Sequence, residues 1–425
     1  MARRLESNSG AHSVTRPAPT RRRVVCVIGT RPEAIKMAPV VRALRQAPWA
    51  DCRVLLTGQH RELVDSMLDF FGIEPDEDLA VMRAGQTLPA LTARLLTSLS
   101  EALGRDKPEM VLAQGDTTTV LASALASFYQ RVPFGHVEAG LRTGRLDAPF
   151  PEEANRAVAS RLAAVHFAPT ETARANLLRE GIDPASVVVT GNTVIDALLV
   201  TARQRAPIGV ELDATARLIL VTAHRRDSFG SPLRRICQAV AELHDRHPDI
   251  QFLWPVHPNP CVRPVVTELL GPLPRVRLCD PLPYGAFVAA LSRAYLVLTD
   301  SGGVQEEAPA LGKPVLVLRA ESERPEAIEA GVARLVGTDP HAIVREADRL
   351  LNDPSAYRSM SQGASPYGDG LAAPRIAAAV GRKLGVKLVS ATFQPPTLSR
   401  QVRPASVEIQ ERMRARRWKI ASTQI

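Results

Sequence analysis

Two segments of this chain have the same order of features: an apolar run, a tight turn and the start of a helix. The first covers residues 24–36 and places Arg31 and Lys36 just after the turn, and the second covers residues 296–307. In a parallel α/β sheet this junction lies at the carboxyl edge of the strands, where ligands bind. A helix start offers unpaired N–H groups and a positive dipole end, which suit phosphate. The two segments therefore predict two α/β domains that face one phosphorylated ligand across a cleft.

Strand and helix patterns alternate through the chain, which favours parallel sheets. We expect strands at 23–29, 53–57, 109–114, 133–138, 164–168 and 187–190, and a second series at 218–223, 251–256, 275–279, 295–299, 314–318 and 332–336. Helical patterns lie between them, for example at 60–71, 117–129 and 170–180. The expected organisation is an N-terminal domain (23–205), a second domain (206–370), a helix that packs back on the first domain (371–389), and basic, disordered ends (1–22 and 390–425).

The net charge of +9 comes from the two ends of the chain. Residues 1–23 hold six Arg and one Glu, and residues 386–425 hold eight Lys or Arg and two Glu, so the part between them is slightly acidic. We therefore expect no nucleic-acid partner, although charged ends of this kind can contact anionic surfaces. No run reaches the roughly 18 apolar residues of a membrane helix, so no membrane partner is expected either.

The five cysteines contain no C-x-x-C pair, which disfavours a zinc site. Reduced thiols of a cytoplasmic protein explain them most simply. The chain has neither a G-x-G-x-x-G fingerprint nor a Walker loop, which disfavours NAD and ATP. No D-x-D-like pair indicates a required metal. We therefore expect no cofactor and no metal.

Three carboxylates follow strands or loops at one expected sheet edge. Asp116 comes after a strand, where a helix cap explains it as well as chemistry does. Glu138 ends an apolar strand, and a buried carboxylate there must be paired or have a raised pKa. Glu152 and Glu153 start a helix after a Pro-rich loop, and the helix dipole accounts for one of them. Together Asp116, Glu138 and Glu152 would support proton abstraction and return on a sugar.

The second half carries groups suited to a nucleotide. His224 ends a strand beside Arg225, and a cationic His next to a leaving phosphate is one interpretation, with a plain polar loop as the alternative. The backbone of Ser301, Gly302 and Gly303 allows close approach to phosphate oxygens, and Glu307 lies one turn further on, within reach of ribose hydroxyls. Arg31 and Lys36 form a cation pair suited to pyrophosphate, or else an ordinary charged surface, and Arg324 adds a cation.

Several long motifs in one order carry a family resemblance over about residues 23–385. They are the segments 29–36, 115–119, 136–144, 151–156, 190–196, 224–226, 300–303 with Glu306 and Glu307, 323–327 and 366–370. On these motifs the chain strongly resembles the non-hydrolysing bacterial UDP-N-acetylglucosamine 2-epimerases. The resemblance implies a fold like that of the GT-B glycosyltransferases, with two Rossmann-like domains and the site in the cleft between them.

The resemblance also implies an activity: reversible epimerisation of UDP-GlcNAc at C2 to UDP-ManNAc, through loss of UDP to a glycal and its re-addition. It implies acid/base roles for Asp116, Glu138 and Glu152, individually unassigned, and a role for His224 in steadying the leaving UDP. The substrate contacts it implies are Arg31, Lys36, Phe287 near uracil, Ser301, Gly302, Gly303, Glu307, and Arg324 on the phosphate side. We further expect a homodimer.

Bacterial relatives use UDP-GlcNAc as an allosteric activator as well. The resemblance makes Gln59, His60 and Arg61 candidates for that site. Two positions depart from the family pattern: Leu282 stands where relatives can carry a uracil-contacting glutamine, and Ala320 where some carry an aspartate. Both concern nucleotide contacts and leave the carboxylate set intact.

Three other functions compete with a non-hydrolysing epimerase. A GT-B glycosyltransferase shares the nucleotide site but needs an acceptor groove and fewer carboxylates. A hydrolysing epimerase would release free ManNAc and UDP. A UDP-sugar sensor without activity would not need the three carboxylates. The sequence does not identify the glycan pathway that consumes the product.

Overall fold

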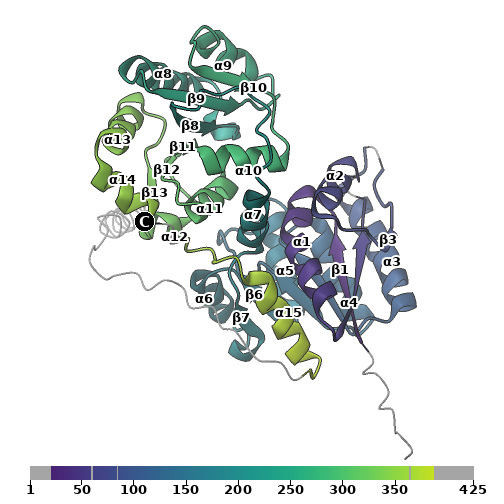
Figure 1. The fold of residues 1–425 in the computed structure, drawn as a ribbon. Helices are drawn as coiled ribbons and strands as arrows, with labels where there is room; N and C mark the ends of the chain where they lie inside the picture. The colour runs from purple at the N-terminus through teal and green to yellow at the C-terminus, as the bar shows by residue number, and fades with distance from the viewer. Residues whose placement is uncertain (1–20, 59–60, 84, 363–364, 387–425) are drawn as a thin grey trace, which may run out of the picture.

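The protein folds around two parallel sheets. The computed structural model describes residues 21–58, 61–83, 85–362 and 365–386. Within these residues the first sheet has the strand order β3-β2-β1-β4-β5-β6-β7 and the second β10-β9-β8-β11-β12-β13, and every pairing is parallel. Helices cover both sheets (Figure 1). The predicted class, α/β with two Rossmann-like domains, is confirmed.

The strands lie close to the ranges expected from the sequence. In the first sheet they are β1 (Arg22–Ile28), β2 (Ala50–Leu56), β3 (Glu77–Asp78), β4 (Met110–Gln114), β5 (Phe134–Val137), β6 (Val165–Ala168) and β7 (Val187–Val189). In the second they are β8 (Arg217–Thr222), β9 (Ile250–Pro255), β10 (Val276–Cys279), β11 (Leu296–Thr299), β12 (Val315–Val317) and β13 (Ala333–Leu335). Only the short edge strand β3 has no counterpart in the expected set, because two polar residues give no apolar run.

The helices alternate with the strands, as βαβ units require. Those of the first part are α1 (Arg31–Gln46), α2 (Arg61–Phe71), α3 (Leu88–Asp106), α4 (Thr118–Tyr129), α5 (Glu152–Leu162), α6 (Glu171–Arg179) and α7 (Thr193–Gln204). Those of the second are α8 (Ser231–Arg246), α9 (Arg263–Leu270), α10 (Tyr284–Arg293), α11 (Gly302–Ala310), α12 (Pro325–Glu329), α13 (Pro340–Asn352), α14 (Pro354–Ser361) and α15 (Ala372–Lys383). Single 3₁₀ turns occur at Pro184–Ser186 and Arg226–Ser228.

The order of the strands fixes where a ligand can bind. In the first sheet the direction of winding reverses between the neighbours β1 and β4, and in the second it reverses between β8 and β11. Ligands of doubly wound sheets bind outside the carboxyl ends of the strands at this reversal. The segments that leave these four strands carry Arg31 and Lys36, Asp116, His224, and Ser301. The fold therefore collects the candidate residues of both halves at two equivalent edges.

The central strands are apolar because both faces of each sheet are covered. Val24 to Ile28 of β1 and Leu218 to Val221 of β8 are all buried. Strands buried on both faces read as continuous Val, Ile and Leu runs, which made these elements predictable. At the start of α1, Pro32 occupies the first turn, where its missing N–H is not needed, and Glu33 accepts hydrogen bonds from the Gly29 N–H at 2.6 Å and the Thr117 hydroxyl at 2.7 Å.

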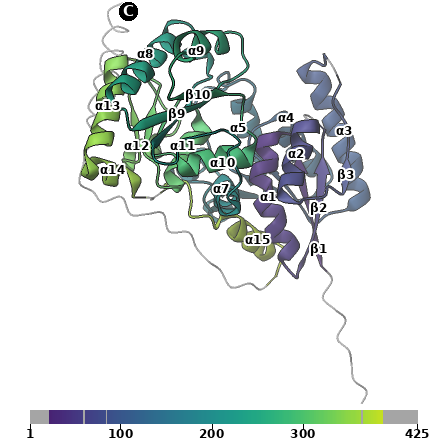
Figure 2. The same ribbon diagram turned by 45° about the horizontal axis from the view of Figure 1, so that its top comes forward.

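Two chain segments connect the domains. The first runs from β7 through Asn192 into α7, which lies between the two sheets in the centre of Figure 1. The second runs back from Tyr367 to α15, which packs on α1 and α7 of the first part (Figure 2). The segments cross where a Cβ on Gly191 would lie 3.2 Å from the Cα of Gly368, and both glycines have positive φ. Only glycine allows so close a crossing.

No helix in the described part of the chain is both long enough and apolar enough to span a membrane. The residue boundaries assigned to the domains stay predictions. The expected disorder of the two basic ends also stays a prediction, because residues 1–20 and 390–425 lie outside the described residues.

Candidate active site

A cavity of about 560 Å³ opens between the two domains. Its first-domain wall includes Arg31, Ile35 and Lys36 of α1, and Val194 of α7. Its second-domain wall includes the predicted residues His224, Phe287, Ser301, Gly303, Glu307 and Arg324, together with Leu282, His257 and Tyr284. The cavity thus brings together most of the substrate contacts expected from the sequence, including residues from both halves of the chain.

Glu138 lies beside this cavity with its carboxylate fully occupied. The Lys36 Nζ atom is 2.6 Å from Oε1 and 2.8 Å from Oε2. Gln114 also donates to Oε2, and Asn192 donates to Oε1 at 2.8 Å. The residue is 8% exposed and has φ +64°, a conformation that L-residues seldom adopt. This left-handed backbone conformation, at the residue that follows β5, places Glu138 at the edge of the sheet, where its carboxylate contacts Lys36.

The ion pair governs the charge of Glu138. Burial alone would raise the pKa of this carboxyl, but Lys36, Arg324 and the Asn192 amide together bring the pKa below its ordinary value. Burial lowers the pKa of Lys36, yet the charges of Glu138 and Glu306 more than offset this and raise it. Both groups are therefore ionised at neutral pH.

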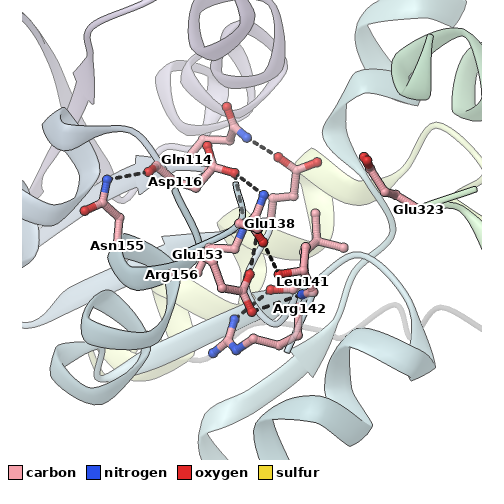
Figure 3. A network of polar contacts seen from close by, with 12 residues as sticks. Gln114, Asp116, Glu138, Leu141, Arg142, Glu153, Asn155, Arg156 and Glu323 are labelled. Carbon is pink, nitrogen blue, oxygen red and sulfur yellow. Dashed lines mark hydrogen bonds and ion pairs between the residues drawn. The ribbon is translucent and has the colours of Figure 1, made fainter. Parts of the chain in front are cut away.

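Asp116 is held by a second ion pair. Arg156 Nη2 and Nε lie 2.6 Å and 3.0 Å from Asp116 Oδ2, and Arg156 Nη1 lies 2.7 Å from Glu153 Oε2 (Figure 3). The other oxygen of Glu153 accepts from the backbone N–H groups of Thr143 and Gly144 at 3.0 and 3.1 Å. Asp116 Oδ1 therefore has no hydrogen bond within the described residues. Both oxygens of Glu153, in contrast, accept hydrogen bonds, one from Arg156 and the other from the backbone at Thr143 and Gly144.

The two neighbouring glutamates at the start of α5 differ sharply. Glu153 is 2% exposed and has the partners just described, whereas Glu152 is half-buried and has no hydrogen bond or ion pair within the described residues. Neither Asp116 nor Glu152 lines the 560 Å³ cavity in this structure. The acid/base roles of Asp116, Glu138 and Glu152 stay predictions. Of these three carboxylates, Glu138 is the one that contacts a residue lining this cavity, namely Lys36.

The second-domain wall is built from the start of α11. Ser301 precedes the helix, and the first-turn N–H groups of an α-helix have no partner within the helix. Gly302 is not among the lining residues, but a Cβ there would approach the Arg225 and Arg324 guanidinium groups at 3.8 Å. Glu307 faces the cavity one turn on. Burial, and then the charge of Glu306, raise the pKa of Glu307 to about 8.

His224 stands between a buried carboxylate and the cavity. Its side chain is 42% exposed, and its Nδ1 lies 3.6 Å from Oδ1 of the fully buried Asp300. Asp300 Oδ2 accepts from the backbone N–H groups of His224 and Arg225 and from the Ser228 hydroxyl, each at 2.9 Å. The other Asp300 oxygen has no hydrogen bond, so it faces the imidazole alone. His257 stacks on His224 with ring centroids 5.7 Å apart.

Desolvation lowers the pKa of His224, and the nearby charges of His257 and Arg225 lower it further, although Asp300 opposes them. The imidazole is therefore mostly neutral at pH 7. An arriving phosphate would favour its protonation, because a nearby negative charge raises a histidine pKa.

Arg324 links this cavity to a second one of about 360 Å³. Its guanidinium pairs with Glu306, and both residues line both cavities. Arg142 and Arg156 also line the second cavity, where Arg142 is paired with Glu180 at 2.7 Å. The cations around this space already have carboxylate partners.

Other candidates have different outcomes. Gln59 and His60 lie outside the described residues, and for Arg61 the structure gives only its place at the start of α2. Ala320 is exposed and lines neither cavity. Among the described residues no group of three or more His, Cys, Asp or Glu side chains could hold a metal ion.

Sequence reasoning did not single out His257, Tyr284, Glu306 or Asn192 as site residues. His257 follows β9 at the same sheet edge as His224, so the edge rule could have found it. The partners of Glu306 and Asn192 come from distant segments, and the sequence carries no local signal for them.

Comparison with known proteins agrees with this geometry. The family model of UDP-N-acetylglucosamine 2-epimerases matches residues 42–381. The UDP-N-acetylglucosamine 2-epimerase of Escherichia coli K12 is 52% identical over 364 residues, which cover 83% of this chain and 97% of the relative. That of Bacillus subtilis is 48% identical over 356 residues, covering 83% and 93%.

A solved structure gives the same result in three dimensions. The crystal structure of UDP-GlcNAc 2-epimerase from Neisseria meningitidis bound to UDP-GlcNAc superimposes with a TM-score of 0.77. It is 44% identical and covers 85% of this chain and 100% of its own. Family match, curated relatives and fold agree, and the chain belongs to the UDP-N-acetylglucosamine 2-epimerase family.

Proposed function

We propose that the protein interconverts UDP-GlcNAc and UDP-ManNAc without net hydrolysis, by eliminating UDP and adding it back. The observation that carries this proposal is the composition of the 560 Å³ cavity. Its second-domain wall offers backbone N–H groups, His224 and Arg324 to a diphosphate, and its first-domain wall brings Lys36 and the buried Glu138 next to the same space. UDP-GlcNAc, to which the Neisseria relative is bound in its crystal structure, fits this arrangement.

In the proposed elimination, a carboxylate takes the proton from C2 of the sugar. The electron pair of that C–H bond forms the C1–C2 double bond, and the bond between C1 and the β-phosphate oxygen breaks. The products are a protonated carboxyl, a glycal and UDP. In the return step the π electrons of the C1–C2 double bond take a proton from a second carboxyl group on the opposite face of C2, and a β-phosphate oxygen of UDP forms the bond to C1. The first carboxyl group then releases its proton to solvent and the second takes one up, so no water is consumed and the C2 configuration is inverted.

The residues divide this work by position. Glu138, Asp116 and Glu152 form the acid/base set, and their individual roles are not assigned. The charge that develops on the leaving UDP falls on the wall that carries His224 and Arg324, and fixed cations and donors at developing charge stabilise a transition state. Protonation of His224 as UDP departs would keep the negative charge neutralised until UDP adds back, with Asp300 stabilising the imidazolium.

Retention of the glycal is what separates epimerisation from hydrolysis. The space between the domains, which Arg31, Lys36 and Arg324 line, would hold UDP and the glycal together, so that re-addition outpaces escape. The donors Lys36, Gln114 and Asn192 favour an ionised Glu138, which is restored between turnovers when its proton is released to solvent.

A proton NMR time course with UDP-GlcNAc in heavy water tests the proposal. We expect UDP-ManNAc signals to appear together with loss of the C2 proton signal through deuterium exchange, and no free sugar. Accumulation of free ManNAc and UDP would replace the proposal by hydrolysing epimerisation. An unchanged spectrum would exclude both epimerases and favour a transferase or a sensor.

A further inference from the structure

Asn192 lies where the two connections between the domains cross. Its side-chain Oδ1 accepts from the Val194 N–H at 3.1 Å and so caps α7. Its backbone N–H donates to the carbonyl of Tyr367, on the returning segment, at 2.6 Å. The residue is 2% exposed. Both connecting segments therefore hold the Asn192 backbone. Because Oδ1 caps α7, Nδ2 is the side-chain atom that is left for other contacts.

The side-chain nitrogen of Asn192 joins two carboxylates from different domains. Nδ2 donates to Oε1 of Glu138 at 2.8 Å and to Oε2 of Glu306 at 2.9 Å. Since Oδ1 is occupied by the cap, the two hydrogens of Nδ2 are the ones that face these oxygens. Both carboxylates are buried, and each also has one cation, Lys36 for Glu138 and Arg324 for Glu306. The Asn192 amide therefore lies between two buried negative charges and donates to both, which offsets the repulsion between them.

We propose that Asn192 is a positioning residue for this reaction, which fixes the Glu138 carboxylate relative to the Glu306–Arg324 pair on the nucleotide wall. The inference rests on the proposed function, because it takes Glu138 to be in the acid/base set. Glu138 follows β5 of the first sheet, while Glu306 lies on α11 of the second domain. The neutral Asn192 amide therefore couples the orientation of the Glu138 carboxylate to that of Glu306, which lines the nucleotide cavity.

Removing the amide has a defined electrostatic consequence. A hydrogen bond donated to a carboxylate stabilises its ionised form, and a nearby like charge disfavours that form. The Asn192 amide contributes to the lowered pKa of Glu138, after the opposing effect of burial and the larger contribution of Lys36. Without it, Glu138 and Glu306 each lose a donor, and the pKa of Glu138 rises.

Two variants separate this role from helix capping. Asn192→Ser keeps a side-chain oxygen suited to the cap and removes both donated hydrogen bonds. Asn192→Asp keeps the size and the cap but places a third negative charge between the carboxylates. Asp339→Ser is the matched control, because Asp339 caps α13 through the Ala342 N–H at 3.1 Å, lines neither interdomain cavity and contacts neither carboxylate.

We expect Asn192→Ser to lower kcat by about tenfold or more, as expected when a general base is held less well. KM and the UDP affinity measured by calorimetry should change by less than about threefold, because no donor to the nucleotide is removed. The acidic limb of the pH profile of kcat should move upward by about one pH unit, the size of shift that one lost donor to a buried carboxylate produces. Asn192→Asp should lose more activity, and Asp339→Ser should match wild type in all of these measurements.

An infrared titration measures the same effect without turnover. The carboxyl band that disappears in Glu138→Gln identifies Glu138, and its midpoint is then compared in wild type and Asn192→Ser. A higher midpoint in the serine variant supports the inference, whereas failure of wild type to epimerise UDP-GlcNAc would overturn the proposed function and, with it, the positioning role. An equal midpoint, or an unshifted kcat profile in folded Asn192→Ser, overturns the inference and leaves the proposed function standing.

Discussion

The two sides of the interdomain cavity satisfy their carboxylates to different degrees. On the first-domain side Glu138 is paired with the lining residue Lys36, and Asp116, which lines neither cavity, is paired with Arg156. On the second-domain side Glu306 is paired with Arg324, but Glu307 has no hydrogen bond or ion pair within the described residues, and Asp300 Oδ1 faces only His224. Preorganised partners cost no reorganisation during a reaction, whereas unsatisfied groups gain most from a ligand. We therefore expect substitutions at Glu138 to affect mainly turnover and substitutions at Glu307 to affect mainly affinity.

The same contrast appears in proton affinity. Lys36 and its neighbours overcome burial and lower the pKa of Glu138, while burial and Glu306 raise that of Glu307 to about 8. Glu138, beside the cavity, and Glu307, which lines it, therefore hold different charges at neutral pH. Substitutions that affect only one wall should affect either turnover or affinity, and the following experiments ask whether that separation holds.

The largest effect is expected for the three acid/base candidates of the first domain. Glu138→Gln, Asp116→Asn and Glu152→Gln should each lower turnover by about a hundredfold or more through loss of acid/base catalysis. UDP affinity should change little in all three variants, because these carboxylates are proposed to act on the sugar. Steady-state kinetics and calorimetry measure the two quantities.

Glu171→Gln is the control for these variants, since Glu171 is an exposed carboxylate in the first turn of α6 and lines neither interdomain cavity. Near-normal turnover in two of the three acid/base variants would show that the carboxylates are wrongly assigned. A large loss of UDP affinity would show that the walls are not separate.

On the second-domain wall the main effect should be on affinity. If Glu307 accepts hydrogen bonds from both ribose hydroxyls, Glu307→Ala should weaken UDP binding by about tenfold to a hundredfold, since charge-assisted hydrogen bonds contribute roughly 1.5–3 kcal/mol. Calorimetry with UDP and with 2′,3′-dideoxy-UDP isolates the ribose contribution. Equal affinity of wild type for the two ligands would rule out Glu307 as the ribose ligand and reduce it to a charge that complements the helix dipole.

A smaller effect should appear when pH is varied. With a pKa of about 8, Glu307 is mostly protonated at pH 7 and mostly ionised at pH 9. Ribose hydroxyls favour the ionised acceptor, so UDP affinity should rise by up to about tenfold between pH 7 and pH 9. Glu307→Gln should abolish the rise. The opposite trend, or the same rise in the glutamine variant, would place the titrating group elsewhere.

The smallest effect is expected outside both walls. Deleting residues 1–20 and 391–425 should leave kcat, KM and UDP affinity essentially unchanged, because every residue that lines the cavity lies between them. The test is the activity of the trimmed protein after purification. Loss of soluble, active enzyme would mean that an end of the chain contributes to the fold or to one wall.

The sequence was enough to predict the strands and turns that carry the site, but not the contacts between its side chains. The structure explains this limit. Apolar runs and turns located the strands that end at the cavity, so Lys36 could be placed at the edge of one sheet, and His224 and Ser301 at the edge of the other. The sequence could not distinguish Glu152 from Glu153, because only the fold aims Glu153 at two backbone N–H groups and Arg156. Partners such as Asn192 and Glu306, 114 positions apart, are set by how the domains meet.

The return of the chain to its first domain affects how the protein is made. Helix α15 is among the last described elements, yet Ile376 and Val380 are completely buried in the core that also contains α1, and Asp196 of α7 accepts from the N–H groups of Ala372 and Ala373. A ribosome builds the first domain long before it releases α15, and domains usually fold in order of synthesis. Here the domain made first is completed last, so its open apolar seam is the surface that a chaperone would need to shield during translation.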